Sequence, residues 1–242
     1  MSERDPTEPE ARRRDWRRGR WSGLRFALAW RLREWLGLHL YGIFTRPLTV
    51  SSVAAPHRLD GYSHQIFEAE GADELTALAA DPRLGLDESF IRDALDKGDA
   101  CSAILHEGTL VSYSWMAFTP THDERGVHVE FGPEFRYLYK AFTLPEYRGR
   151  HALRLFKSLR DDYCVQRGRS SAITFIAIDN DPSMKAAYGT GNQRIGFAGF
   201  IKLGPAFFTF RSARVRAVGF RFFTPGTRPA PPQRRPDMMP SP

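Results

Sequence analysis

The chain has 242 residues, of which 42% are hydrophobic and 13% aromatic, enough for one domain with a substantial core. Its formal net charge of +7 favours acidic ligands such as a phosphorylated cofactor. The two cysteines, Cys101 and Cys164, belong to no set of Cys or His at ligand spacing, which disfavours a metal site and predicts two buried thiols. Because the N-terminus opens with charged residues rather than a signal peptide, we expect a cytoplasmic protein.

Composition divides the chain into four parts. Residues 1–19 are polar and without periodicity, which predicts a disordered basic N-terminus. Residues 20–50 predict an amphipathic basic helix that ends between Gly37 and Gly42, followed by a short strand over 41–50. Residues 51–223 alternate between strand and helix patterns, and the Pro- and Arg-rich residues 224–242 predict a disordered tail.

The basic helix leaves two interpretations open. Its apolar stripe could lie on a membrane surface, peripherally, or pack against the domain or a partner protein; Phe26 and Glu34 blur the lipid-facing pattern and favour packing. Either contact would involve residues 20–45, and an oligomer is compatible with the second. The stretch contains several charged residues, so it should not span a bilayer.

The remaining elements follow from hydrophobic spacing and turn signals. Helical spacing predicts helices over 72–80, 87–97 and 150–167, and a further helix opened by Asn180 and Pro182. Apolar runs predict strands over 63–70, 101–105, 110–118, 127–131, 137–142, 172–178, 197–203, 206–210 and 215–223.

The centre of this pattern is a strand, a turn and a helix start, between Tyr137 and Leu153. The turn Arg148-Gly149-Arg150 joins the strand to an amphipathic helix. Free backbone N–H groups at the helix start, the helix dipole and the two arginines predict a site for a phosphate or pyrophosphate. An ordinary basic turn on the surface is the alternative.

The segment 143–150, TLPEYRGR, resembles the signature of the GNAT N-acetyltransferase superfamily, whose loop holds the pyrophosphate of acetyl-coenzyme A. His151 and Leu153 depart from it, because the family usually has Gly at the first position and Gly or Ala at the second. Asn180 and Ser183, followed by a Gly-Phe pair at 196–197, resemble a second family element, with 188–193 read as an inserted loop.

The resemblance covers residues 63–210 and implies an α/β (α+β) fold, with a mixed, mostly antiparallel central sheet flanked by helices. It implies acetyl-CoA as co-substrate, bound along the signature strand, at the turn and beside the following helix. The implied cofactor-binding residues are Phe142, Thr143, Leu144, Arg148, Gly149, Arg150, His151, Ala152, Leu153, Asn180 and Ser183. For the last two, helix capping requires the same residue types and is the alternative role.

The acid and the base are sought among nearby side chains. The signature strand holds no carboxylate, so Glu130 in the preceding strand is the candidate for a water-mediated base; a solvated strand residue is the alternative. Tyr188 is the candidate that protonates the leaving thiolate; a helix-end aromatic is its alternative. Tyr137 and Tyr139 could line the acceptor tunnel.

These observations predict an N-acetyltransferase that moves an acetyl group from acetyl-CoA to an amine by direct attack in a ternary complex. The acceptor is not identified by the sequence. The alternative is a catalytically degenerate GNAT-like domain that docks to a membrane or partner protein through its basic N-terminal helix. Nucleic acid is disfavoured as a partner, because nine arginines cluster over residues 11–33 rather than on an aromatic platform.

Overall fold

The computed structural model describes residues 37–50, 58–59, 61–122, 126–148 and 156–224, and the account below concerns these residues. The predicted basic N-terminus, most of the amphipathic helix and the Pro- and Arg-rich tail lie outside the described residues. So do Gly149, Arg150, His151, Ala152 and Leu153 of the predicted anion-binding turn.

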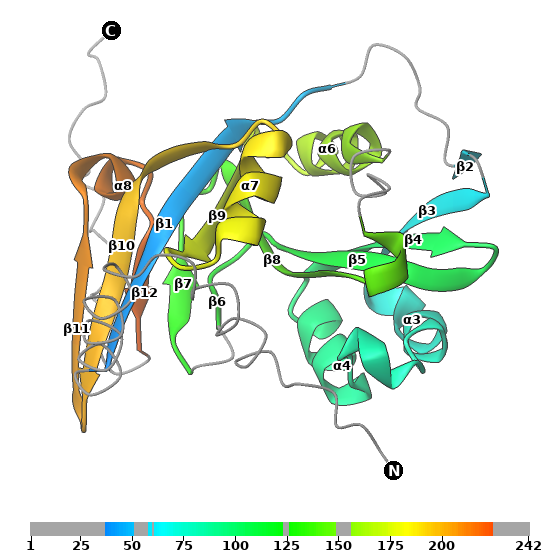
Figure 1. The fold of residues 1–242 in the computed structure, drawn as a ribbon, viewed down its shortest axis with the longest axis horizontal. Coiled ribbons are helices and arrows are strands. Elements are labelled where there is room, and N and C mark those ends of the chain that lie inside the picture. Colours follow the sequence, from blue (N-terminus) through cyan, green and yellow to red (C-terminus); the bar gives the residue numbers. More distant parts are fainter. Residues whose placement is uncertain (1–36, 51–57, 60, 123–125, 149–155, 225–242) are drawn as a thin grey trace, which may run out of the picture.

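A nine-stranded sheet forms the centre of the molecule, in the order β11-β10-β1-β9-β8-β5-β4-β3-β2 (Figure 1). Its neighbouring strands are antiparallel except for β8 and β9, which run parallel. The strands are β1 (Leu38–Pro47), β2 (Arg58–Leu59), β3 (Tyr62–Phe67), β4 (Ala100–His106), β5 (Thr109–Ala117), β8 (Phe135–Thr143), β9 (Ser171–Ala177), β10 (Gln193–Leu203) and β11 (Ala206–Arg211). This confirms the predicted α+β class with a mixed, mostly antiparallel sheet.

Helices cover the sheet from both sides. In Figure 1, α3 and α4 lie on one side of the β3–β5 half of the sheet, and α6 lies on the other side. The helices are α3 (Ala72–Leu78), α4 (Glu88–Asp96), α6 (Lys157–Gln166), α7 (Asp181–Gly189) and α8 (Ala213–Ala217), with short 3-10 turns at η2 (Ala69–Gly71), η3 (Pro82–Leu84) and η4 (Pro145–Tyr147). Within the described ranges, none of the helices is long and apolar enough to cross a membrane.

Local signals explain why several elements lie where the sequence predicts them. The Asp87 side chain accepts a hydrogen bond from the Phe90 N–H at 2.8 Å and so caps the start of α4. The β4–β5 hairpin turns at Glu107 and Gly108, which both have positive φ angles, as a tight two-residue hairpin requires. Cys101 and Cys164 are free and buried, as predicted.

The N-terminal side of the sheet matches the prediction in part: the strand predicted over 41–50 corresponds to β1, which begins earlier, at Leu38. The chain is extended from Leu38 onward, so the helix does not continue to Gly42, and β1 lies between β9 and β10. The physical reason is burial: Tyr41, Ile43 and Phe44 are at most 1% exposed, and the strand is paired along both edges. The sheet thus includes a strand before residue 51, and residues 38–45 are committed to it rather than to a membrane or partner.

Two further segments also differ from the prediction. The segment 215–223 is not one strand: α8 buries Val215, the chain turns at Gly219 (φ +70°), and only β12 (Arg221–Phe223) is extended. The segment 188–193 is not an inserted loop, because α7 runs to Gly189 and β10 begins at Gln193. The predicted strand over 127–131 is confirmed as β7 (His128–Glu130), and it belongs to a second, three-stranded sheet with β12 and β6 (Thr121–His122).

A buried ion pair joins β1 to α6. The guanidinium of Arg46 donates to both carboxylate oxygens of Asp161, each at 2.6 Å, and the two side chains are 4% and 0% exposed. Burial alone would raise the pKa of Asp161, but the hydrogen bonds from Arg46 and the charges of Arg46, Arg136 and Arg160 hold that pKa below its ordinary value. The ionised carboxylate is therefore part of the packing between the sheet and this helix.

Replacing this carboxylate should destabilise the protein strongly. We expect Asp161→Asn to lower the free energy of unfolding by about 3–5 kcal/mol, because it leaves buried guanidinium groups without their anion. Urea denaturation at pH 7 measures the change, and Asp93→Asn on exposed α4 is the control, expected to stay within about 0.5 kcal/mol. Because the folded-state pKa of Asp161 is lowered, the higher free energy of unfolding of the wild type should be present above about pH 4 and be lost as pH falls below it. A variant as stable as the control would contradict the role.

Candidate functional site

The parallel strands β8 and β9 form a fork. Their backbones pair over only three residues, from Phe135 opposite Ser171 to Tyr137 opposite Ile173, and the strands then separate (Figure 1). One side-chain contact follows, in which Thr174 Oγ1 donates to the Leu138 carbonyl at 2.9 Å. From there to Thr143, the edge of β8 that faces away from β5 has no pairing strand within the described part of the chain. Such an edge offers main-chain donors and acceptors to a ligand.

A β-bulge interrupts β8 beside the fork. The pairing with β5 shifts between Tyr113, opposite Phe142, and Trp115, opposite Tyr139, so that two β8 residues face one β5 residue. The first of the two, Lys140, has a φ of 41°, a left-handed conformation that is costly for a residue with a side chain. The bulge therefore redirects main-chain groups of β8 at the open edge.

The end of β8 carries the described part of the signature segment. The Leu144 N–H donates to the Val111 carbonyl at 3.0 Å, and η4 then turns the chain. Arg148 is exposed, with its Nε donating to the Thr143 carbonyl at 3.0 Å and its guanidinium 5.6 Å from the Phe142 ring. The structure thus brings Phe142, Thr143, Leu144 and Arg148 together at one end of the open edge.

The second motif lies at the end of the other arm. β9 leads into α7, whose N-cap is Asn180, and its Oδ1 accepts a hydrogen bond from the Ser183 N–H at 3.2 Å. Pro182 occupies the first turn, where its missing N–H costs nothing. Helix capping is therefore a role that Asn180 fills. Asn180 also lies next to the fork, and the cofactor contact of Asn180 and Ser183 stays a prediction.

The two predicted catalytic residues lie on different parts of the fold. Tyr188 is on α7, 54% exposed, with its ring 5.4 Å from that of Phe44. Glu130 is on β7 in the smaller sheet, and its carboxylate is bound by the guanidinium of Arg221. The structure does not bring Glu130 beside β8 through strand pairing, because β7 pairs with β6 and β12.

A polar cluster that the sequence did not predict lies beside the bulge. The Tyr139 hydroxyl donates to Asp99 Oδ2 at 2.5 Å, and Lys97 Nζ is 3.0 Å from the same oxygen. The other oxygen, Oδ1, is buried and has no hydrogen-bond partner among the described residues. Burial raises the pKa of the Asp99 carboxyl above its ordinary value, although Tyr139 and Lys97 oppose the shift.

The sequence held only a weak signal for this cluster. Asp99 stands directly before the apolar run of β4, and its side chain is buried there rather than exposed to solvent. Its partner Tyr139 is 40 residues away, so the contact depends on the pairing of β4, β5 and β8 rather than on local spacing. A buried carboxylate with a raised pKa beside a strand irregularity is typical of functional sites.

The fold and the fork together define a class of protein: a sheet with one opened strand edge that ends beside an exposed arginine, Arg148. This geometry suits an extended ligand that carries amide groups along its length and an anionic group at one end.

A scan against protein-family models finds no matching family, and no curated protein matches the sequence. Among solved structures, the chain matches a GNAT-family acetyltransferase from Novosphingobium aromaticivorans with 15% identity and a TM-score of 0.43, over 73% of this chain. It also matches one from Colwellia psychrerythraea with 13% identity and a TM-score of 0.45, over 72% of this chain and 56% of that one. These neighbours belong to the family that the two motifs resemble.

A third match is AAC(6')-Iy in complex with the bisubstrate analog CoA-S-monomethyl-acetylneamine, with 12% identity, a TM-score of 0.41 and coverage of 54% of this chain and 89% of that one. The chain spans 66% of the length of the Novosphingobium structure, and 57% and 52% of the length of two further matched structures. The likeness therefore concerns the fold, and activity has to be argued from the site itself.

The capping role of Asn180 gives a direct test. We expect Asn180→Ala to lower the free energy of unfolding by about 1 kcal/mol, because it removes the acceptor for an N–H at the start of α7. Ser183→Ala is the matched control, since only its main chain takes part in the cap, and it should change stability by less than about 0.5 kcal/mol. Urea denaturation compares the two variants, and equal losses would argue against the cap.

Proposed function

We propose that the protein is an acyl-coenzyme A-dependent N-acyltransferase that uses acetyl-CoA or a related thioester and an amine acceptor. The observation that carries this proposal is the open edge of β8, which ends at Thr143 beside Arg148. Pantetheine is an extended chain with two amide groups, so it can add to this edge as a short strand would. The anionic end of the coenzyme then meets the exposed Arg148.

The direction of binding places the thioester near the bulge. From Thr143 back to Leu138, the strand covers roughly 17 Å at about 3.4 Å per residue. A coenzyme anchored by its phosphates at Arg148 therefore directs its thiol end toward Lys140 and the closed end of the fork. The redirected main-chain N–H groups of the bulge are the proposed donors to the thioester carbonyl, whose oxygen gains negative charge in the transition state.

Acyl transfer needs two proton movements. A C–N bond forms to the thioester carbonyl carbon, the C–S bond breaks, one proton leaves the amine and one is taken up by sulfur. Tyr188 remains the proposed donor to sulfur, because its exposed phenol stands on the helix that follows β9. Asn180 and Ser183, at the start of that helix, are proposed to lie beside the coenzyme arm.

Two carboxylates compete for the role of proton acceptor. The carboxylate of Glu130 is already occupied by the guanidinium of Arg221. Asp99 has a raised pKa, an oxygen without a partner among the described residues, and a hydrogen bond to Tyr139 next to the bulge. We therefore propose Asp99 in place of Glu130: Tyr139 passes its hydroxyl proton to Asp99 while its oxygen accepts the proton of the amine.

The two carboxylates can be separated by their pH profiles. We expect Asp99→Asn to lower kcat by about 100-fold or more and to remove the acidic limb of the kcat profile, because the ionised carboxylate is the active form. Since its folded-state pKa is raised, wild-type activity should rise with pH above about 4, the ordinary value for Asp. Glu130→Gln is the matched control and should keep both rate and profile. If Glu130→Gln loses rate and the acidic limb while Asp99→Asn keeps both, Glu130 is the proton acceptor instead.

The coenzyme site is tested by calorimetric titration with acetyl-CoA, free CoA and ADP. We expect Arg148→Ala to weaken CoA binding by about 10-fold or more, because it removes a charge-assisted contact to phosphate, without lowering the melting temperature. Arg214→Ala on exposed α8 removes the same charge and should leave affinity unchanged. Equal losses in both variants would indicate a general charge effect. Absence of binding to folded wild-type protein would overturn the proposed function.

A further inference from the structure

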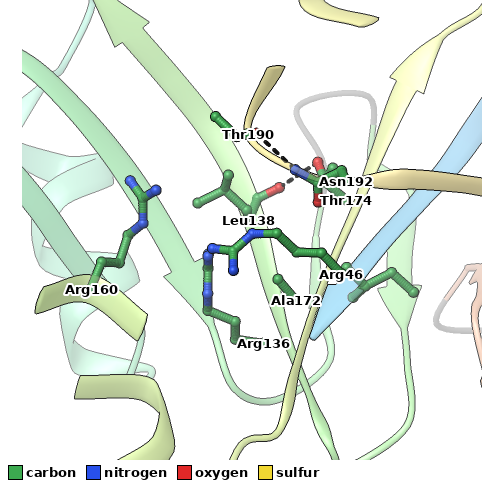
Figure 2. Close-up of a pocket in the computed structure, with 9 residues that line it drawn as sticks. Arg46, Arg136, Leu138, Arg160, Ala172, Thr174, Thr190 and Asn192 are labelled. Atoms are coloured by element: carbon green, nitrogen blue, oxygen red, sulfur yellow. Dashed lines mark hydrogen bonds between the residues drawn. The ribbon is translucent and has the colours of Figure 1, made fainter. Parts of the chain in front are cut away.

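Three arginines converge behind the fork, away from its open edge. Arg46 comes from β1, Arg136 from β8 and Arg160 from α6, and they are 5%, 1% and 5% exposed. In Figure 2 the Arg46 and Arg136 side chains meet at the centre of the cavity that all three line, with Arg160 approaching from α6. The single carboxylate in contact with this cluster among the described residues is Asp161.

Asp161 does not satisfy the whole cluster. Arg46 takes both of its oxygens, whereas Arg136 reaches it only with Nη2, at 3.6 Å. Arg160 donates from Nη1 to Ser114 Oγ at 3.3 Å. Three nitrogens are left buried without a hydrogen-bond partner among the described residues: Nε and Nη1 of Arg136, and Nε of Arg160. Buried donors in this state carry the full cost of their lost hydration.

The charges are also unbalanced. Three guanidinium groups meet one carboxylate, and Lys157 adds a fourth cation with its Nζ 3.7 Å from Asp161 Oδ2. Burial and the neighbouring Arg136 lower the pKa of Arg160 to about 9, and burial lowers that of Arg136. A second anion in the cluster would offset this repulsion and supply acceptors for the orphaned N–H groups.

The space left between these side chains limits the size of that anion. The cavity has a volume of about 20 Å³ and is lined on the side opposite Arg160 by Thr190 and Asn192. A cavity volume of roughly 10–15 Å³ is enough for one water molecule. The head of a carboxylate is therefore about the largest group that this cavity accepts, and a tetrahedral phosphate is too large for it. Water alone would accept the hydrogen bonds but leave the charge uncompensated.

We propose that Arg136 and Arg160 bind one small carboxylate in this cavity. A carboxylate matches guanidinium groups in shape and charge, and the Arg46–Asp161 pair shows the same recognition inside the cluster. The cavity lies next to the closed end of the fork, because Leu138 and Thr174 line it too. The carboxylate is therefore either a free small acid or the terminal carboxylate of an acyl group carried on coenzyme A.

The acyl group on coenzyme A, as the source of the carboxylate, rests on the proposed function, whereas the anion site itself does not. A thioester placed near the bulge would direct its acyl group toward Leu138 and the arginines behind it. A succinyl-type group would then bring its carboxylate to Arg136 and Arg160, and the preferred donor would be a dicarboxylic acyl-CoA rather than acetyl-CoA.

The anion site is tested without any coenzyme, by titrating the full chain with sodium formate at constant ionic strength. We expect a saturable rise in melting temperature, broadening of the ¹³C-formate resonance, and no equal effect of sulfate. Arg136→Met should abolish both signals, and Arg83→Met, an exposed arginine on η3, should retain them. If Arg136→Met does not fold, Arg160→Met takes its place. A rise that follows ionic strength alone, or formate broadening that is unchanged in Arg136→Met or Arg160→Met, overturns the proposal.

The source is tested by comparing succinyl-CoA with acetyl-CoA by calorimetry. For an acyl carboxylate, we expect succinyl-CoA to bind at least about 10-fold more tightly, as a charge-assisted hydrogen bond permits. Arg136→Met should then cancel this difference, and formate should compete with succinyl-CoA but not with CoA. For a free acid, the two thioesters should bind equally while formate still binds. If no thioester binds but formate does, the proposed function fails and the anion site stands.

Discussion

The site depends on the early end of one parallel strand pair. β8 and β9 share only three residue pairs, because each is held by a different antiparallel neighbour. β9 follows β1 from Tyr41 to Pro47, and β8 follows β5 as far as Thr143. Main-chain groups on the β8 edge beyond Tyr137, which no described strand pairs, are then available to water or to a ligand. The bulge at Lys140 increases the local twist and turns part of that edge toward the gap.

The packing behind the fork keeps its arms apart. The Arg46–Asp161 pair ties β1, the neighbour of β9, to α6, the helix that follows β8. Both arms are thereby connected to a single buried ion pair. Its loss would leave the other buried cations of the cluster facing one another without an anion. Removing one partner of such a pair costs more than the pair contributes, since the remaining charge stays buried. The separation of β8 and β9 therefore depends on packing in the core rather than on the conformation of a loop.

The sequence predicted the features that short-range chemistry determines. The start of α4, the β4–β5 hairpin and the start of α7 lie where they were predicted, and each depends on a local signal: the cap at Asp87, the turn at Gly108 and the cap at Asn180. The strand predicted over 41–50 corresponds to β1, but its start at Leu38 was assigned to the preceding helix, because only its two neighbours in the sheet, β9 and β10, make its burial evident. The Tyr139–Asp99 contact was missed for a related reason: it joins distant segments through strand register, which spacing along the chain does not encode.

The alternation of side chains along β8 links the two polar clusters. Successive residues of a strand point to opposite faces, so Arg136 and Leu138 lie on one face and Tyr139 on the other. The first two line the arginine cavity beside α6, whereas Tyr139 contacts Trp115 and Asp99 on the side of α4. One strand thus presents Arg136 to one side and Tyr139, the partner of the proposed proton acceptor Asp99, to the other. For an acyl transfer at its open edge, this separates the groups that would hold the acyl donor from those that would deprotonate the amine.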